Sequence, residues 1–92
     1  MKPSGRASIP SQVLTRMVGD ELVVLNLSTG TYYGLDPIGA KIWENIVEGK
    51  SLGEICAQLL QEYDVPVAEL ESDILQLTGD LAANGLMILD VE

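Results

Sequence analysis

Residues 23–43 constrain the fold of this chain more than any other stretch, because two strand patterns, a turn and a helix start follow one another without a gap. Residues 23–27 and 31–35 are rich in the aliphatic, β-branched and aromatic side chains that favour strands, and Ser, Thr and Gly at 28–30 form a turn between them. Asp36 and Pro37 then supply a helix N-cap followed by proline in the first turn. This order predicts a strand at 31–35 at the edge of a sheet and beside a helix, a place where proteins bind a peptide as an added strand.

The segments on either side of this stretch complete an α+β pattern. Residues 12–18 and 21–27 read as strands joined by a hairpin turn at Gly19 and Asp20, because glycine accepts the positive φ that such turns require. Apolar residues at helical spacing then predict three helices. These begin at Asp36-Pro37, at the capping box of Ser51 and Glu54, and at Pro66. The first ends at Gly49 and the third at Asn84-Gly85, and the apolar pattern of the second continues to Tyr63. We therefore expect a three-stranded antiparallel β-meander followed by three α-helices, with the apolar segment 86–89 as either a short strand or a core plug.

The length of 92 residues is that of one domain. Residues 1–10 are rich in Pro, Ser and Gly and are expected to be a flexible N-terminus, so residues 11–92 form the predicted domain. The single cysteine, Cys56, excludes an internal disulfide. No apolar run approaches the roughly 18 residues of a membrane span, and no apolar signal region follows the first residues. By elimination, we expect a cytoplasmic protein that does not bind a membrane.

The net charge of −9 is confined to the second half of the chain. Residues 1–50 hold five acids and all five bases, whereas residues 51–92 hold nine acids and no Lys or Arg. Proteins bind nucleic acid by placing Lys and Arg against phosphates, and the second half of this chain would repel them. The charge distribution therefore disfavours a nucleic-acid-binding protein.

The residues needed for the common kinds of catalysis are missing. The chain has no histidine, so Cys56 has no histidine base to activate it, and no glycine-rich phosphate loop is present. Glu69, Glu71 and Asp73 lie in or near the first turns of a predicted helix, where acids interact favourably with the helix dipole and do not indicate a metal site. We expect no enzymatic activity, no metal and no cofactor.

Two features mark candidate contacts for a partner. Tyr32 and Tyr33 are adjacent, so their side chains point to opposite faces of a strand, and the sequence leaves open which of them meets a partner. On the third helix, Leu75, Thr78 and Ala82 flank one side of the core stripe and widen its apolar arc. This arc serves either extra packing against a neighbouring helix or one wall of a groove.

An ordered set of residues resembles the PqqD-like family, which is named for the small protein D of pyrroloquinoline quinone synthesis. The resemblance extends over residues 12–90. It is carried by Ser28-Thr29-Gly30, Thr31-Tyr32-Tyr33-Gly34-Leu35-Asp36, Gly39-Ala40, Ile42-Trp43, Gly49-Lys50-Ser51-Leu52, Ile55, Tyr63-Asp64, Asp73-Ile74, Leu77, Leu81 and Asn84-Gly85-Leu86.

This resemblance implies a winged helix-turn-helix-like fold and a recognition element for ribosomally made, post-translationally modified peptides. In such domains the leader region of the precursor peptide adds as a strand to the third strand and lies against the third helix. Mapped onto this chain, the strand contributes Thr31, Tyr32, Tyr33, Gly34 and Leu35. The helix contributes Ile74, Leu75, Thr78 and Ala82, which we select from the helical wheel.

Within the family, the chain looks similar to the free-standing recognition proteins of lasso peptide clusters. That likeness implies three partners: the leader peptide, a separate cysteine leader peptidase and an asparagine-synthetase-like cyclase. Two alternatives stay open: a recognition protein for another peptide-derived pathway, such as quinone synthesis, and a winged-helix DNA-binding regulator.

Overall fold

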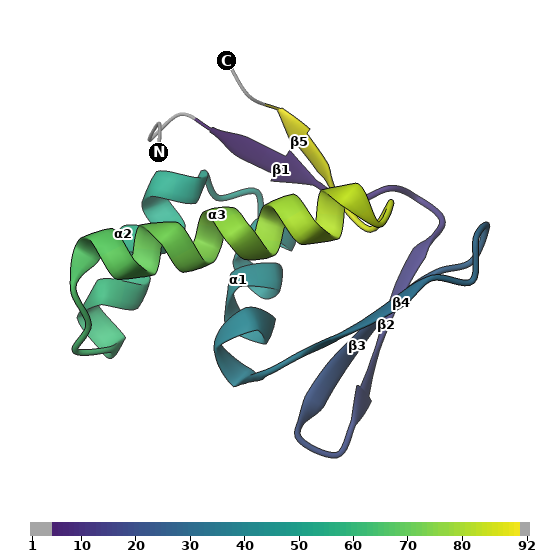
Figure 1. Cartoon of the computed structure of the whole chain (residues 1–92), viewed down its shortest axis with the longest axis horizontal. Coiled ribbons are helices and arrows are strands. Elements are labelled where there is room, and N and C mark those ends of the chain that lie inside the picture. Colours follow the sequence, from purple (N-terminus) through teal and green to yellow (C-terminus); the bar gives the residue numbers. More distant parts are fainter. Residues whose placement is uncertain (1–4, 91–92) are drawn as a thin grey trace.

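The computed structural model describes residues 5–90, in which the first of three helices packs against one face of a three-stranded sheet and the second helix packs on the first and the third (Figure 1). The sheet is an antiparallel meander in the order β2 (Val13–Val18), β3 (Glu21–Asn26) and β4 (Tyr32–Leu35). Gly19 and Gly30 take φ values of 62° and 76° in the two connections, a left-handed backbone that side chains disfavour. The expected meander is therefore confirmed, with β3 in the centre and an edge strand on each side.

The three helices begin at the predicted caps. They are α1 (Pro37–Val47), α2 (Leu52–Glu62) and α3 (Val67–Ala83). The Asp36 carboxylate accepts a hydrogen bond from the Gly39 N–H at 2.7 Å, which fixes the start of α1 directly after β4. At α2, the Ser51 hydroxyl accepts from the Glu54 N–H at 3.2 Å while the Glu54 carboxylate accepts from the Ser51 N–H at 2.9 Å. The expected capping box is thus formed in full.

A second, two-stranded sheet joins the two ends of the chain. β1 (Arg6–Ser8) pairs antiparallel with β5 (Ile88–Asp90), so part of the segment expected to be a flexible N-terminus is ordered strand. The Gly5 carbonyl also accepts a hydrogen bond from the Leu52 N–H at 2.8 Å. Each strand pairs with residues 80 to 84 positions away in the sequence, so no local pattern indicates this pairing. Residues 1–4 lie outside the described residues.

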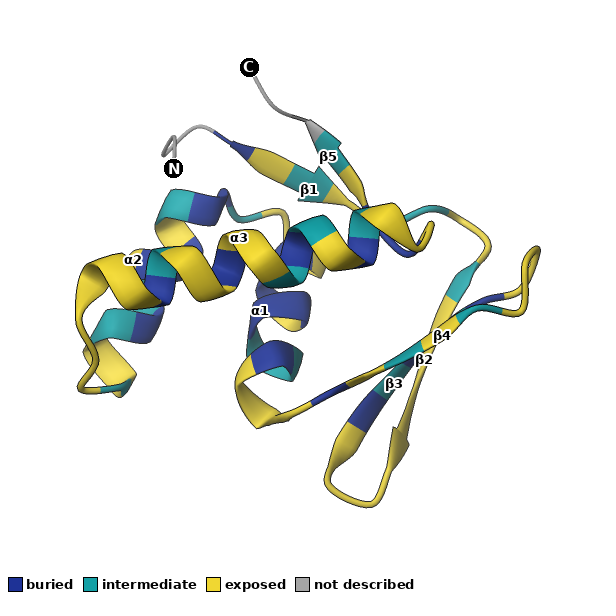
Figure 2. Ribbon diagram, viewed as in Figure 1, coloured by how far each residue is buried: buried dark blue, intermediate teal, exposed yellow. Residues whose placement is uncertain are grey.

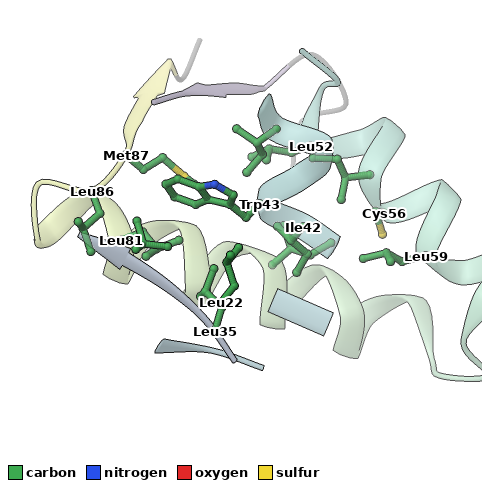
Figure 3. Close-up of a cluster of buried hydrophobic side chains, with 14 of the residues drawn as sticks. Leu22, Leu35, Ile42, Trp43, Leu52, Cys56, Leu59, Leu81, Leu86 and Met87 are labelled. Atoms are coloured by element: carbon green, nitrogen blue, oxygen red, sulfur yellow. The ribbon is translucent and has the colours of Figure 1, made fainter. Parts of the chain in front are cut away.

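The core lies between the meander and the helices. The last core residues in the sequence come directly before β5. Figure 3 shows Trp43 among side chains from β3, β4, all three helices and the segment after α3. Leu86 and Met87 are buried, and the strand begins only at Ile88, so the segment 86–89 is both a core plug and a strand. Of the two predicted domain segments, 11–92 contains the meander and the helices, and the β1–β5 pair extends the folded unit to residue 6.

Candidate functional site

The outer edge of β4 has no strand partner among the described residues, and the register shows which backbone groups it offers. The Asn26 N–H donates to the Thr31 carbonyl at 2.8 Å, which makes this a hydrogen-bonded pair. Bonded pairs alternate along an antiparallel ladder, so Tyr33 opposite Val24 is the next bonded residue. The N–H and C=O groups of Tyr32 therefore point outward, and the same alternation leaves those of Gly34 free.

The side chains of β4 alternate between the two faces of the sheet, and this separates Tyr32 from Tyr33, which the sequence could not do. Tyr32 is 73% exposed on the face of the sheet that turns away from the helices. Tyr33 is half-buried and Leu35 is buried on the helix side. Tyr32 thus offers its backbone to an added strand, and Tyr33 offers its side chain to the space beneath that strand.

That space is a hollow of about 340 Å³ between β4, the start of α1 and α3, which we call the β4 hollow. Its lining is mainly apolar and comprises Tyr33, Gly34, Leu35, Asp36, Ile38, Gly39, Ile42, Asp73 and Leu77. Ile38 is 39% exposed at the first turn of α1, although it is a large aliphatic side chain. A strand added to β4 would therefore have alternate side chains directed into an apolar depression.

The residues of α3 that were predicted to contact the peptide do not lie together at the β4 hollow. Ile74 and Thr78 are fully buried in the core, and the Thr78 hydroxyl donates to the Ile74 carbonyl at 2.8 Å, which satisfies this polar group within the helix. Leu75 is 45% exposed, but it precedes Leu77 by two positions and so lies about 200° around the helix from it. The structure does not bring Leu75 to the β4 hollow.

Ala82 follows Leu75 by seven positions and shares its side of α3, so it too is directed away from the hollow. Asp73 and Leu77 are one helical turn apart and line the hollow instead. Sequence reasoning missed both as site residues. The helical wheel identifies two flanks of the core stripe, but only the packing of α3 on the meander determines which flank meets β4.

The outer sheet face is the second unusual surface. Cross-strand neighbours Leu14, Leu25 and Tyr32 lie in one row across β2, β3 and β4, and Arg16, Val23 and Gly34 form the next row. Leu14 is 52% exposed and Val18, further along β2, is 58% exposed. Figure 2 shows that most of β2 and the tip of the β2–β3 hairpin are exposed. No helix of the described residues covers these apolar side chains.

Other chemistry is sparse in the part of the chain that the structure describes. Cys56 is buried in the core, and burial raises the pKa of its thiol, which disfavours the reactive thiolate. Residues 5–90 contain no group of three or more Cys, Asp or Glu side chains arranged to hold a metal ion. None of the helices among them is long and apolar enough to cross a membrane.

Comparison with models of protein families shows to which family this chain belongs. The family model described as coenzyme PQQ synthesis protein D (PqqD) matches residues 21–87, which span the meander from β3 onward and all three helices. This chain belongs to the PqqD family. The resemblance noted in its sequence is thereby confirmed, as is the expected α+β fold of a meander followed by three helices.

Two solved structures of similar proteins extend the comparison. The PqqD-family chain is 38% identical to the protein in the structure "TbiB1 in Complex with the TbiA(beta) Leader Peptide", with a TM-score of 0.79 over 86% of this chain and 92% of that one. It also matches "Lasso peptide synthetase B1 complexed with the leader peptide" with a TM-score of 0.83 at 24% identity, over 90% of this chain and 98% of that one. The second likeness supports the fold alone. No curated protein sequence matches the chain.

Proposed function

We propose that this protein binds the leader region of a ribosomally made precursor peptide by strand addition at the free edge of β4. The observation that carries the proposal is the outward backbone of Tyr32 and Gly34 directly above the β4 hollow. Main-chain hydrogen bonds to the edge give affinity in this mode of binding, and pockets for alternate side chains give specificity. Membership of the PqqD family and the likeness to leader-bound TbiB1 support the same function.

The protein acts in this proposal as a non-catalytic adaptor that presents the leader to separate enzymes, a leader peptidase and a lasso cyclase. The 38% identity to TbiB1, which is bound to a leader peptide, supports the leader-binding role, and the sequence resemblance to the free-standing recognition proteins of lasso peptide clusters favours a lasso pathway over quinone synthesis. The exposed apolar row of Leu14, Leu25 and Tyr32 on the outer sheet face supports docking of a partner protein, because such patches are otherwise unfavourable in water. We place this assembly in the cytoplasm, where ribosomal precursors are made.

Proline substitutions at neighbouring positions of β4 test the proposed edge. Tyr32→Pro removes an outward N–H, so the fold should persist while peptide binding is lost, since edge strands tolerate proline. Tyr33→Pro removes an N–H that bonds to β3, so the domain should lose about 1–3 kcal/mol of unfolding free energy. A fluorescent leader peptide reports binding, and thermal melting reports the fold.

The paired design separates backbone from side-chain effects. Tyr32→Ala removes the same ring as Tyr32→Pro but keeps the N–H, so it should retain most of the affinity. If Tyr32→Pro folds and binds the leader as tightly as the parent protein does, β4 is not the docking edge.

A further inference from the structure

One carboxylate in the β4 hollow has no role in the fold. Two acids line this space, Asp36 and Asp73. The Asp36 carboxylate is engaged as the N-cap of α1, where it accepts from the Gly39 N–H. The exposed Asp73 lies in the middle of α3, away from both helix ends, and its carboxylate makes no hydrogen bond or ion pair among the described residues. It stands beside Leu77 at the rim of the hollow, whose lining is mainly apolar.

The hollow also lacks a cation. Of the described bases, Lys41 pairs with Glu62, Lys50 donates to Asn45 and Gln58, and Arg6 donates to the Gly49 carbonyl. Arg16 lies on the outer sheet face, on β2. No Lys or Arg appears in the lining of the hollow, and the chain carries a net charge of −9. The potential at the hollow is therefore negative, and it favours a positively charged group on whatever enters.

We infer that Asp73 is a specificity-determining residue and that the peptide segment bound at β4 places a lysine or arginine in the β4 hollow. This inference rests on the proposed function, because strand addition is what directs alternate side chains into the hollow. The aliphatic stem of the basic residue packs on Leu77 and Ile38, while its charged head reaches the Asp73 carboxylate at the open rim. An acidic side chain at the same position is rejected, because it meets a like charge.

Asp80 supplies a matched control on the same helix. It follows Asp73 by seven positions and so shares its side of α3, but it does not line the hollow. Replacing either acid by asparagine removes one negative charge from α3 at nearly constant volume. Only the replacement of Asp73 removes a charge from the lining of the hollow, where the capping carboxylate of Asp36 remains.

The test is a selection of random short peptides displayed on phage, carried out in parallel against the parent protein, Asp73→Asn and Asp80→Asn. Peptides enriched by the parent protein and by Asp80→Asn should share a Lys or Arg at one fixed position, and those enriched by Asp73→Asn should not. A fluorescent copy of one selected peptide should bind Asp73→Asn about fivefold more weakly than Asp80→Asn at low salt. The difference should shrink as salt is added, because the charge pair is partly exposed to solvent.

The outcomes separate this inference from the function beneath it. The role assigned to Asp73 is contradicted if the parent protein enriches strand-forming peptides without a basic residue, or if Asp73→Asn still prefers a basic residue. Either result leaves strand addition at β4 intact. If the parent protein enriches no peptide, or if the selected peptide binds a folded Tyr32→Pro variant as well as the parent, strand addition at β4 itself is wrong.

Discussion

Asn26 links the two elements that form the candidate site through a single buried amide. Its Oδ1 accepts from the Ser28 N–H at 2.9 Å and the Thr29 N–H at 3.3 Å, so it holds the turn that leads into β4. Its Nδ2 donates to the Gly85 carbonyl at 2.7 Å, just after the end of α3. Asn26 is 3% exposed, so these bonds are shielded from water. The side chain therefore positions β4 relative to the helix that faces it.

Asn26→Ala should lower the unfolding free energy by about 1–3 kcal/mol, because it leaves the Gly85 carbonyl and two turn N–H groups without partners. Urea unfolding followed by circular dichroism measures this loss. Asn84→Ala is the matched control, since the Asn84 amide makes an exposed bond to the Asp80 carbonyl and its removal should change stability little. Equal stability of the two variants would contradict the positioning role of Asn26.

The sequence predicts only half of what Asn26 does. Its place at the end of a strand pattern, ahead of Ser, Thr and Gly, indicates a turn residue, and the two bonds to Ser28 and Thr29 agree. The bond to Gly85 joins residues 59 positions apart, and it depends on the packing of α3 against the meander. Thr78 differs from its prediction more clearly, because the helical wheel places it beside the core stripe as a peptide contact, whereas it is buried in the core.

At the scale of elements, α3 presents two flanks, and only one of them borders β4. Asp73 and Leu77 line the hollow, whereas Leu75 lies on the opposite flank. The apolar stripe drawn from the sequence is Val67, Leu70, Ile74, Leu77 and Leu81, of which Leu70, Ile74 and Leu81 are buried, Leu77 is half-buried and Val67 is exposed. It could not choose the flank, because that choice depends on how α3 crosses the sheet.

Leu77→Asp and Leu75→Asp distinguish the two flanks. A charge at position 77 lies in the apolar hollow and should weaken leader binding about tenfold or more. The same charge at position 75 is directed elsewhere and should leave binding unchanged. Anisotropy titration of the fluorescent leader measures both variants, and circular dichroism verifies their fold. Because Leu77 is half-buried, Ile38→Asp at the exposed rim of the hollow provides a second variant. Weaker binding in Leu75→Asp alone would reverse the assignment.

The capping box of α2 makes stability depend on pH in a defined direction. The hydrogen bond from the Ser51 backbone N–H lowers the pKa of Glu54 below its ordinary value of 4.5, so the ionised form stabilises the fold. This contribution is complete above that ordinary value and is lost as the pH falls through it and through the lowered folded-state pKa.

Glu54→Gln should therefore be less stable than the parent protein at neutral pH, and the difference should close in acid, where Glu54 is itself neutral. Thermal melting over a series of pH values tests this. Glu44→Gln, at an exposed position on α1, is the control for removing one acidic charge away from the capping box. A gap between Glu54→Gln and the parent that persists unchanged in acid would rule out the ionised carboxylate as the stabilising form.

The elements that sequence patterns predict best are those with local signals. Gly30 marks a turn and Asp36 and Ser51 mark two helix starts, each together with neighbours only a few positions away, and the structure places all three as expected. A strand near residues 86–89 is one of two expectations, but β1 and its pairing with β5 escape prediction, because both strands are short and supply each other's hydrogen bonds from opposite ends of the sequence.

At the scale of the whole molecule, the fold separates an apolar strand edge from an acidic helical half. Residues 51–92 supply nine acids and no base, and α2 and α3 are drawn from this half. A winged-helix protein that reads DNA would place basic side chains on such a helix to contact phosphates, and α3 has none. The acidic charge of this half is compatible with a peptide partner, because the peptide is bound mainly by main-chain hydrogen bonds at β4.

The central claim is that a leader peptide becomes the strand next to β4, and amide hydrogen exchange measured by NMR tests it most directly. In the free protein, the amides of Tyr33 and Leu35 should exchange slowly because they bond to β3, and those of Tyr32 and Gly34 should exchange fast. Saturating leader peptide should slow exchange at Tyr32 and Gly34, while the amides of β2 stay as they were. If the peptide binds and the amides of Tyr32 and Gly34 still exchange as fast as in the free protein, the peptide is not an added strand at this edge.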